Sequence, residues 1–396
     1  MSSIGLKNNR LVSIDYMRAT LAYLGIILHA AFIIIVYDNF ENKNDPISIS
    51  FLSFIITFIH SFRIEIFFLI AGYFFAYQVS NRSFKNYISS RFKSIAIPLL
   101  AIYGLSKVPT LIYFIFLHLH MIEIGSNQEL LSPQKIHNAL IQNFDQLSYL
   151  WFLYFLLLYY LITLTIIHIV RLTNIINKKI NLGLYWVINN RYSLLILSLI
   201  TSLITAHNFN IELHLSSTWR PEVSIFLFYY VFFIVGWLVF QTNRLWSSFQ
   251  SNCQIYFILG IFFLIIIFTH QISHANFMIN ANKKSSLSIT ILYNFMAWLF
   301  TFSIIGLFTY IKRPNKYILY LSQSSYWVYL SHFPVLLLII PIMTLFFKNN
   351  LIIFVISIII TTIIVLSSYH FFVRSTWIGK LLNGKRYKTS LKYNSH

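Results

Sequence analysis

Residues Leu11–Val36 read LVSIDYMRATLAYLGIILHAAFIIIV, a run that is long and apolar enough to cross a bilayer. The run nevertheless carries Asp15, Arg18 and His29. Arg18 and His29 are eleven residues apart, so on a helix both project from one face, roughly 16 Å apart along the axis. Asp15 lies one turn before Arg18 and can act as its counter-ion. Ionisable groups at membrane depth usually face a protein interior or a wet cavity, so this helix indicates a functional site.

The second apolar run, 51–78, reads FLSFIITFIHSFRIEIFFLIAGYFFAYQ and adds His60, Arg63 and Glu65. His60 and Arg63 share a helix face. Glu65 lies about 200° around the helix from Arg63, which requires either two polar-lined sides or a local break in the helix.

Three interpretations of these ionisable groups stay open. In one, Arg18 snorkels to the membrane surface and His29 sits among the headgroups. In the second, Arg18 pairs with Asp15 and Arg63 pairs with Glu65, and both pairs only fix helix packing. We favour the third, a functional interior, because six ionisable groups in the first two runs are hard to explain by snorkelling.

The composition predicts an all-α, polytopic membrane protein. Of 396 residues, 58% are hydrophobic and only 10% are charged, and the apolar residues come in blocks of about 20. The single cysteine, Cys253, excludes an internal disulfide. We expect one transmembrane domain over 1–396 with ten spans, at about 11–36, 51–78, 94–118, 148–170, 192–207, 223–241, 253–270, 287–311, 317–343 and 350–373.

The basic residues predict the orientation. The formal net charge is +19, but these residues alternate with the spans instead of forming one stripe, so we expect no nucleic-acid partner. With a cytoplasmic N-terminus, 20 of the 29 Lys and Arg residues fall inside and six outside. Both termini are therefore predicted to be cytoplasmic, with 374–396 as a basic tail.

A basic segment precedes the third span and reads SNRSFKNYISSRFKSIAIP, with four cations and no acid. It includes Arg91 and Lys93. Such a cluster can bind anionic lipid headgroups, the simpler interpretation from charge alone, or a phosphorylated ligand.

Two later segments carry further candidates. Trp151, at the start of the fourth span, can belong either to an interfacial aromatic belt or to a substrate site. His332 in the ninth span lies roughly 22 Å from its inner end, near the depth of His29. Pro334 disturbs the helix just beyond it.

An ordered set of motifs runs along the whole chain: Arg18-x10-His29, HSFRIEIFFLIAGYFF, RFKSIAIP, YLWFL, FFIVGW, SYWVYLSHFPV and FVRSTWIGKLLNGKR. This set resembles the acyltransferase-3 family of membrane enzymes, and within it the branch associated with succinylating periplasmic glucans. The resemblance implies a bacterial inner-membrane enzyme with about ten spans, a cytoplasmic acyl-CoA donor and a carbohydrate acceptor. It also implies His29 and Arg18 at the reaction centre and an R-x-x-R pair on the CoA phosphate.

The chain departs from that pattern at two positions. Arg91 matches the first basic position, but Ser94 stands at the fourth, so Lys93 or a neighbour must supply the second charge. Lysine is a point charge and cannot copy the fork of an arginine. Tyr149 stands where related sequences often have a histidine before the LWFL motif.

The predicted function is O-acyl transfer from acetyl-CoA or succinyl-CoA, with no permanently bound cofactor and no metal. The reaction needs a base that takes the hydroxyl proton and a group that stabilises the developing oxyanion. The expected catalytic residues are His29, Arg18, Glu65, which can orient an imidazole, and His332. The expected substrate-binding residues are Asp15, His60, Arg63, Arg91, Lys93 and Trp151. The alternatives are a proton-coupled exporter that uses the same groups, and a binding or scaffold protein.

Overall fold

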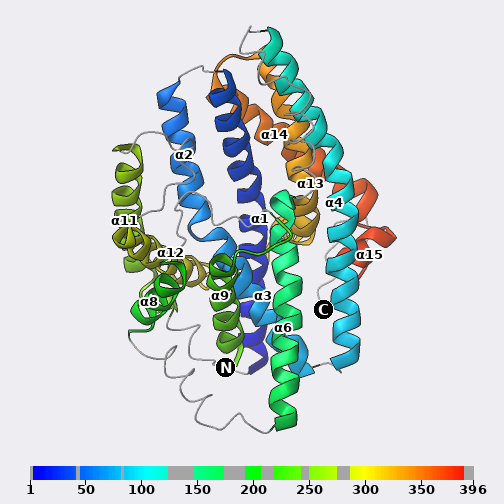
Figure 1. The fold of residues 1–396 in the computed structure, drawn as a ribbon. Helices are drawn as coiled ribbons and strands as arrows, with labels where there is room; N and C mark the ends of the chain where they lie inside the picture. The colour runs from blue at the N-terminus through cyan, green and yellow to red at the C-terminus, as the bar shows by residue number, and fades with distance from the viewer. Residues whose placement is uncertain are drawn as a thin grey trace.

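The computed structural model describes residues 3–41, 45–81, 84–123, 146–173, 192–206, 218–241, 249–273 and 286–387. These residues form helices, with one isolated antiparallel bridge between Gln146 and Thr218. The all-α class is therefore confirmed for the described part of the chain (Figure 1).

The described residues form α-helices of very different lengths. They are α1 Ser3–Glu41, α2 Pro46–His60, α3 Arg63–Asn81, α4 Phe84–Glu123, α6 Trp151–Thr173, α8 Ser193–Thr205, α9 Val223–Gln241, α11 Cys253–Ser273, α12 Leu287–Phe308, α13 Lys316–Phe346, α14 Asn350–Ser368 and α15 Trp377–Asn383. A 3₁₀ turn, Ser148–Leu150, precedes α6, and a π-helical turn, Tyr369–Val373, follows α14.

Nine apolar helical segments in the described residues are long enough to cross a membrane. They match nine of the ten expected spans. At the position of the expected span 192–207 the structure has α8, whose 13 residues are fewer than the about 20 that a perpendicular span needs. The chain is an integral membrane protein.

The second expected span is divided into two helices. α2 ends at His60, Ser61 and Phe62 form a turn, and α3 begins at Arg63. The spacing of Arg63 and Glu65 required either two polar sides of one helix or a local break, and the structure has the break. At the other end of α2, the Asp45 carboxylate accepts a hydrogen bond from the Ser48 backbone N–H at 3.1 Å, which caps the helix. The Ser48 hydroxyl and then this backbone N–H lower the pKa of Asp45.

Two other segments differ from expectation. The basic segment before the third span is helical, because α4 already begins at Phe84, so Arg91 and Lys93 stand on a helix and not in a loop. The described part of the expected tail, 374–387, contains α15. Both differences bring basic residues to fixed positions at the same end of the bundle.

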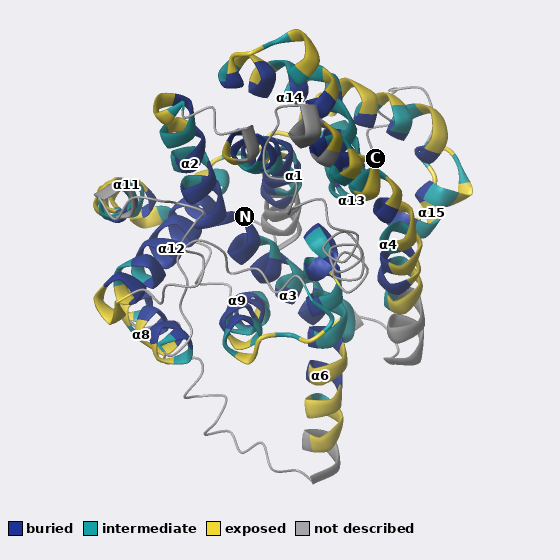
Figure 2. Ribbon diagram, turned by 45° about the horizontal axis from the view of Figure 1, so that its top comes forward, coloured by how far each residue is buried: buried dark blue, intermediate teal, exposed yellow. Residues whose placement is uncertain are grey.

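α1 runs through the middle of the molecule, with α2, α11 and α12 on one side and α4, α13 and α14 on the other (Figure 1). Buried residues are concentrated on α1, α3, α9 and α12, whereas α6 and α14 expose much of their length (Figure 2). The exposed side chains of the outer helices are largely apolar, as in Leu105, Ile258 and Ile359, which suits contact with lipid tails.

The helices α3 and α9 cross with their backbones in contact. A Cβ atom added at Gly72 would overlap the Phe233 carbonyl oxygen, and one added at Gly236 would overlap the Leu69 carbonyl oxygen. Such close approach through small residues is a common way to pack helices in a membrane. The crossing fixes α3, the helix that carries Arg63 and Glu65.

Candidate active site

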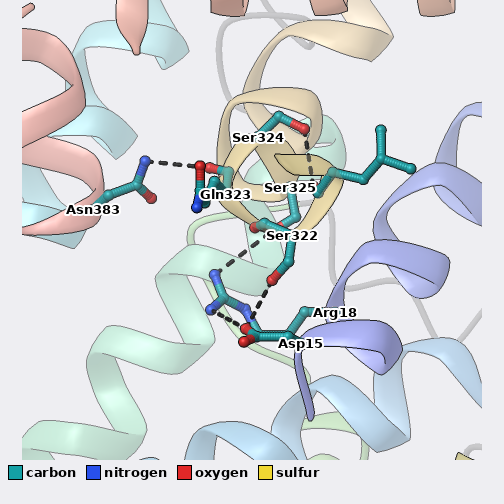
Figure 3. Close-up of polar contacts among 8 residues, drawn as sticks. Asp15, Arg18, Ser322, Gln323, Ser324, Ser325 and Asn383 are labelled. Atoms are coloured by element: carbon teal, nitrogen blue, oxygen red, sulfur yellow. Dashed lines mark hydrogen bonds and ion pairs between the residues drawn. The ribbon is translucent and has the colours of Figure 1, made fainter. Parts of the chain in front are cut away.

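A polar seam joins the first half of α1 to α13 (Figure 3). The Ser322 hydroxyl donates to Asp15 Oδ1 at 2.9 Å, and an Arg18 Nη donates to the Ser325 hydroxyl at 3.5 Å. Arg18 and Asp15 also form the expected ion pair, at 3.9 Å between Nη1 and Oδ1, and both side chains are about one-third exposed. The seam therefore places an ion pair at the wall of a solvent-accessible space.

That space is a cavity of about 990 Å³, which we call the basic cavity. It lies between α1, α3, α4, α6, α13 and the segment 377–387. Asp15 is the only acid among its described lining residues. Its cationic lining residues are Arg18, Arg63, Arg91, Lys93, Lys380 and Lys385.

Arg63 forms the inner end of the basic cavity and is only 3% exposed. Its Nε donates to the Leu21 carbonyl oxygen at 2.9 Å, which satisfies one of its donors inside the protein. The guanidinium lies against Gly25, where a Cβ atom would overlap it. Gly25 thus gives Arg63 the space to reach α1, one turn before His29 on the same helix face.

His29 on α1 and His332 on α13 face one another, with ring centroids 5.2 Å apart and a 45° tilt between the planes. The matching depth of these two histidines is confirmed. Because a carbonyl oxygen can only accept, His332 Nδ1 donates its proton to the Val328 carbonyl oxygen at 2.7 Å. His332 Nε2 is buried and has no hydrogen-bond partner among the described residues. A neutral His332 ring therefore keeps an unshared lone pair on Nε2.

Two tyrosines lie between the basic cavity and the histidine pair. Tyr329 lines the cavity, and its hydroxyl donates to the Tyr149 carbonyl oxygen at 2.8 Å. The Tyr149 ring packs edge-on to His332 at 5.7 Å, and its hydroxyl donates to the Leu330 carbonyl oxygen at 2.6 Å. The hydrogen bond and the ring contact therefore hold the Tyr149 side chain in one position next to His332. Sequence reasoning marked Tyr149 only as a departure, and Tyr329, one turn before His332, was missed.

Glu65 lies on the other side of α3. It is fully buried, and both carboxylate oxygens have no hydrogen-bond partner in the described ranges. The alternative of an Arg63–Glu65 ion pair is wrong, because no such pair forms among the described residues. The expected orienting hydrogen bond to an imidazole is also absent, since neither oxygen accepts from any described residue.

Two further candidates lie outside the basic cavity. His60 is buried at the end of α2, and its Nε2 has no hydrogen-bond partner among the described residues. Trp151 is 3% exposed and packs on Phe155 and Tyr229, so it belongs to the aromatic core and not to an interfacial belt. Neither residue lines the basic cavity.

The expected phosphate-binding residues do lie at the cavity. Arg91 and Lys93 both line it, and Arg91 Nε donates to the Gln78 side-chain oxygen at 3.0 Å. Ser94, the position at which the family pattern has a second arginine, lines the same cavity. Lys380 and Lys385 were not among the predicted site residues, although the motif FVRSTWIGKLLNGKR that contains them was noted.

Comparisons with known proteins agree with this arrangement. The acyltransferase domain of the acyltransferase-3 family matches residues 11–370. Curated relatives described as glucans biosynthesis protein C, from Salmonella paratyphi B, Salmonella heidelberg and Salmonella agona, are each 31% identical over 140 residues. That match covers 35% of this chain and 34% of each relative's length. No solved structure matches the chain significantly.

The family match extends from the first membrane helix, which carries Arg18 and His29, to the last, so it includes the histidine pair and the part of the basic cavity that α1, α3, α4, α6 and α13 form, but not the segment 377–387. The chain belongs to the acyltransferase-3 family.

Proposed function

We propose that this protein moves an acetyl or succinyl group from cytoplasmic acyl-CoA to a hydroxyl group of a carbohydrate, such as a glucan, across a bacterial inner membrane. One arrangement carries the proposal: the basic cavity ends at Arg63, and Arg63 packs on Gly25, one turn before His29. A donor that enters by its acyl end thus reaches the neighbourhood of the histidine pair while its phosphates stay at the mouth.

The basic cavity suits a long donor with a phosphorylated end. Its volume, about 990 Å³, lies at the upper end of the range for small-molecule sites. Arg91 and Lys93 at the mouth can form charge-assisted hydrogen bonds to phosphate. Apolar side chains such as Phe74 and Leu156 also line the cavity, which suits the pantetheine arm, and the buried Arg63 can hold the thioester carbonyl.

The histidine pair supplies the acid–base chemistry. The acceptor hydroxyl oxygen attacks the thioester carbonyl carbon while the His29 imidazole takes the hydroxyl proton. The Arg63 guanidinium stabilises the oxyanion that forms. The carbon–sulfur bond then breaks, and the proton passes to the sulfur of the departing CoA. His332, fixed by its hydrogen bond to Val328, holds the neighbouring ring in place.

The carbohydrate acceptor is supported by the relatives' name, which refers to the biosynthesis of glucans. The direct test is to incubate purified protein in neutral detergent with acetyl-CoA or succinyl-CoA and a periplasmic glucan, and to look for new esters on the glucan by mass spectrometry. Ester formation supports the proposal. Glucan export without turnover of acyl-CoA contradicts it and favours the proton-coupled exporter.

The cytoplasmic position of the donor site needs a separate test. In a Cys253→Ser background, Arg313→Cys marks the end of the bundle near the basic cavity, and Lys348→Cys marks the opposite end. We expect a membrane-impermeant thiol reagent to label Lys348→Cys from outside intact inner-membrane spheroplasts, and Arg313→Cys only after lysis. The opposite labelling pattern would place the donor outside.

A further inference from the structure

The segment Arg374–Tyr387 folds back against the mouth of the basic cavity. Asn383 Nδ2 donates to the Gln323 carbonyl oxygen of α13 at 3.2 Å (Figure 3). The Tyr387 backbone N–H donates to the Arg374 carbonyl oxygen at 3.0 Å, which closes the segment on itself. Gly384, with φ of 75°, makes the left-handed turn that directs Lys385 and Tyr387 back to the cavity. The segment is therefore part of the cavity wall.

The start of this segment also contacts the rest of the protein. The Arg374 backbone N–H donates to the Tyr369 carbonyl oxygen at 2.8 Å, and the Arg374 guanidinium lies 4.7 Å from the centre of the Tyr320 ring. Arg374 is only 5% exposed. A Cβ atom added at Gly379 would overlap the Val373 carbonyl oxygen, so α15 packs directly on the π-helical turn.

The far end of the segment reaches the polar seam on α1. Tyr387 lines the cavity beside Asp15 and Arg18, and burial raises the pKa of Tyr387 while the Arg18 guanidinium acts in the opposite direction. The Lys385 ammonium lies 5.0 Å from the centre of the Tyr387 ring. The segment thus spans the mouth from α13 to α1.

The charges in this cavity are unbalanced. Six cationic side chains line it against one carboxylate, and that carboxylate, Asp15, already pairs with Arg18. Within the described ranges, no acid forms an ion pair with Lys380 or Lys385. Like charges gathered in one concave space attract anions and repel one another, so the arrangement is favourable when a polyanionic ligand is bound.

We propose that Lys380 and Lys385 complete the phosphate-binding mouth with Arg91 and Lys93, and so hold the nucleotide end of the donor. The inference rests on the proposed acyl-CoA donor and deepens it. Ser94 stands at the position where the family pattern has a second arginine, and it cannot bind phosphate through a positive charge. The segment 377–387 compensates, because it brings two further cations to the same cavity. Lysine ammonium groups act as point charges on phosphate.

The test measures the binding of coenzyme A to the purified full-length protein in neutral detergent. The variants are Lys380→Gln with Lys385→Gln, and Lys380→Arg with Lys385→Arg. The matched control is Lys316→Gln, which removes a lysine from the start of α13, outside the cavity lining. Thermal unfolding checks that each variant is folded, and pantetheine serves as a ligand without phosphate.

We expect the double glutamine variant to bind coenzyme A roughly tenfold to a hundredfold more weakly, since charge-assisted contacts to phosphate are lost. Its affinity for pantetheine, and the affinity of the arginine variant and of Lys316→Gln for coenzyme A, should stay near wild type. High salt should remove most of the difference between wild type and the glutamine variant.

Three other outcomes would contradict either the role of the two lysines or the proposed donor. If wild type binds coenzyme A and the double glutamine variant binds it equally well, this inference is overturned while the proposed donor stands. If the double variant loses binding of phosphatidylglycerol but keeps coenzyme A affinity, the lysines bind lipid headgroups and the inference again fails. If wild type does not bind coenzyme A at all, the proposed donor itself fails.

Discussion

His29 and His332, on helices separated by some three hundred residues of chain, stand with their ring centroids 5.2 Å apart. His332 Nδ1 is committed to the Val328 carbonyl oxygen, so its ring cannot rotate freely without losing that bond. The pair therefore consists of one imidazole that a hydrogen bond fixes and one, His29, that forms no such hydrogen bond with the described residues. In the proposed mechanism, His29 therefore transfers the proton and His332 holds its position.

His29→Ala is expected to lower kcat about 10² to 10⁴-fold, because it removes the proposed general base. The protein should remain folded, since only one side chain is shortened. The measurement is acyl-CoA turnover with a glucan acceptor, and the matched control is His168→Ala, which changes an exposed histidine on α6. Wild-type turnover in His29→Ala would remove the base from the mechanism.

His332→Asn is expected to keep thermal stability near wild type and to lower kcat at least about tenfold. The asparagine amide can still donate near the Val328 carbonyl, but the imidazole ring that faces His29 is lost. Thermal unfolding and turnover should be measured on the same preparation. An unchanged kcat would show that His332 acts only in packing.

Gly25→Ala is expected to reduce turnover about as much as Arg63→Lys. The new methyl group would overlap the Arg63 guanidinium and displace it from the inner end of the cavity. Gly104→Ala is the matched control, because a Cβ atom there meets nothing within 4 Å. Full activity of Gly25→Ala together with reduced activity of Arg63→Lys would show that Arg63 works equally well in another position.

Gly72→Ala and Gly236→Ala are expected to destabilise the protein by about 1 to 3 kcal/mol each, because each adds a methyl group to a backbone contact between α3 and α9. Gly104→Ala should instead be neutral or stabilise by about 0.5 to 1 kcal/mol, as expected for alanine in a helix. Thermal unfolding in detergent compares the three. Equal melting temperatures would mean that α3 and α9 can move apart to make room for the methyl group without loss of stability.

Ser94→Arg is expected to strengthen coenzyme A binding up to about tenfold, and Arg91→Ala to weaken it tenfold to a hundredfold, since contacts to phosphate contribute about 1.5 to 3 kcal/mol. Both positions line the basic cavity. Isothermal titration in neutral detergent measures both affinities. If neither substitution changes the affinity, phosphate does not bind at this part of the mouth.

The sequence predicts those features that depend on spacing along one helix or on the length of an apolar block. The Asp15–Arg18 pair follows from a three-residue spacing, and the equal depth of His29 and His332 follows from their distances to the helix ends. The break before Arg63 was one of two solutions that the sequence allowed. Nine spans follow from apolar length alone.

What the sequence does not predict depends on packing between distant segments. A tryptophan at the start of a span, such as Trp151, is typical of an interfacial aromatic belt. Only the contacts with Tyr229 and Phe155 show that Trp151 lies in the aromatic core. The two-residue spacing already turns Glu65 away from Arg63, but only the packed structure shows that neither Glu65 oxygen has a hydrogen-bond partner among the described residues. Lys380 becomes a cavity residue only because the chain turns back after α14.

The polar seam between α1 and α13 has a consequence for biogenesis. Asp15 and its partner Ser322 are 307 residues apart, so the ribosome delivers the first helix long before α13 exists. During that interval Asp15, Arg18 and His29 are at membrane depth without the partners that later cover them. The nascent chain must therefore keep α1 at the insertion machinery, or beside a chaperone, until α13 arrives, and chains that stop before Lys316 should be targets for membrane proteolysis.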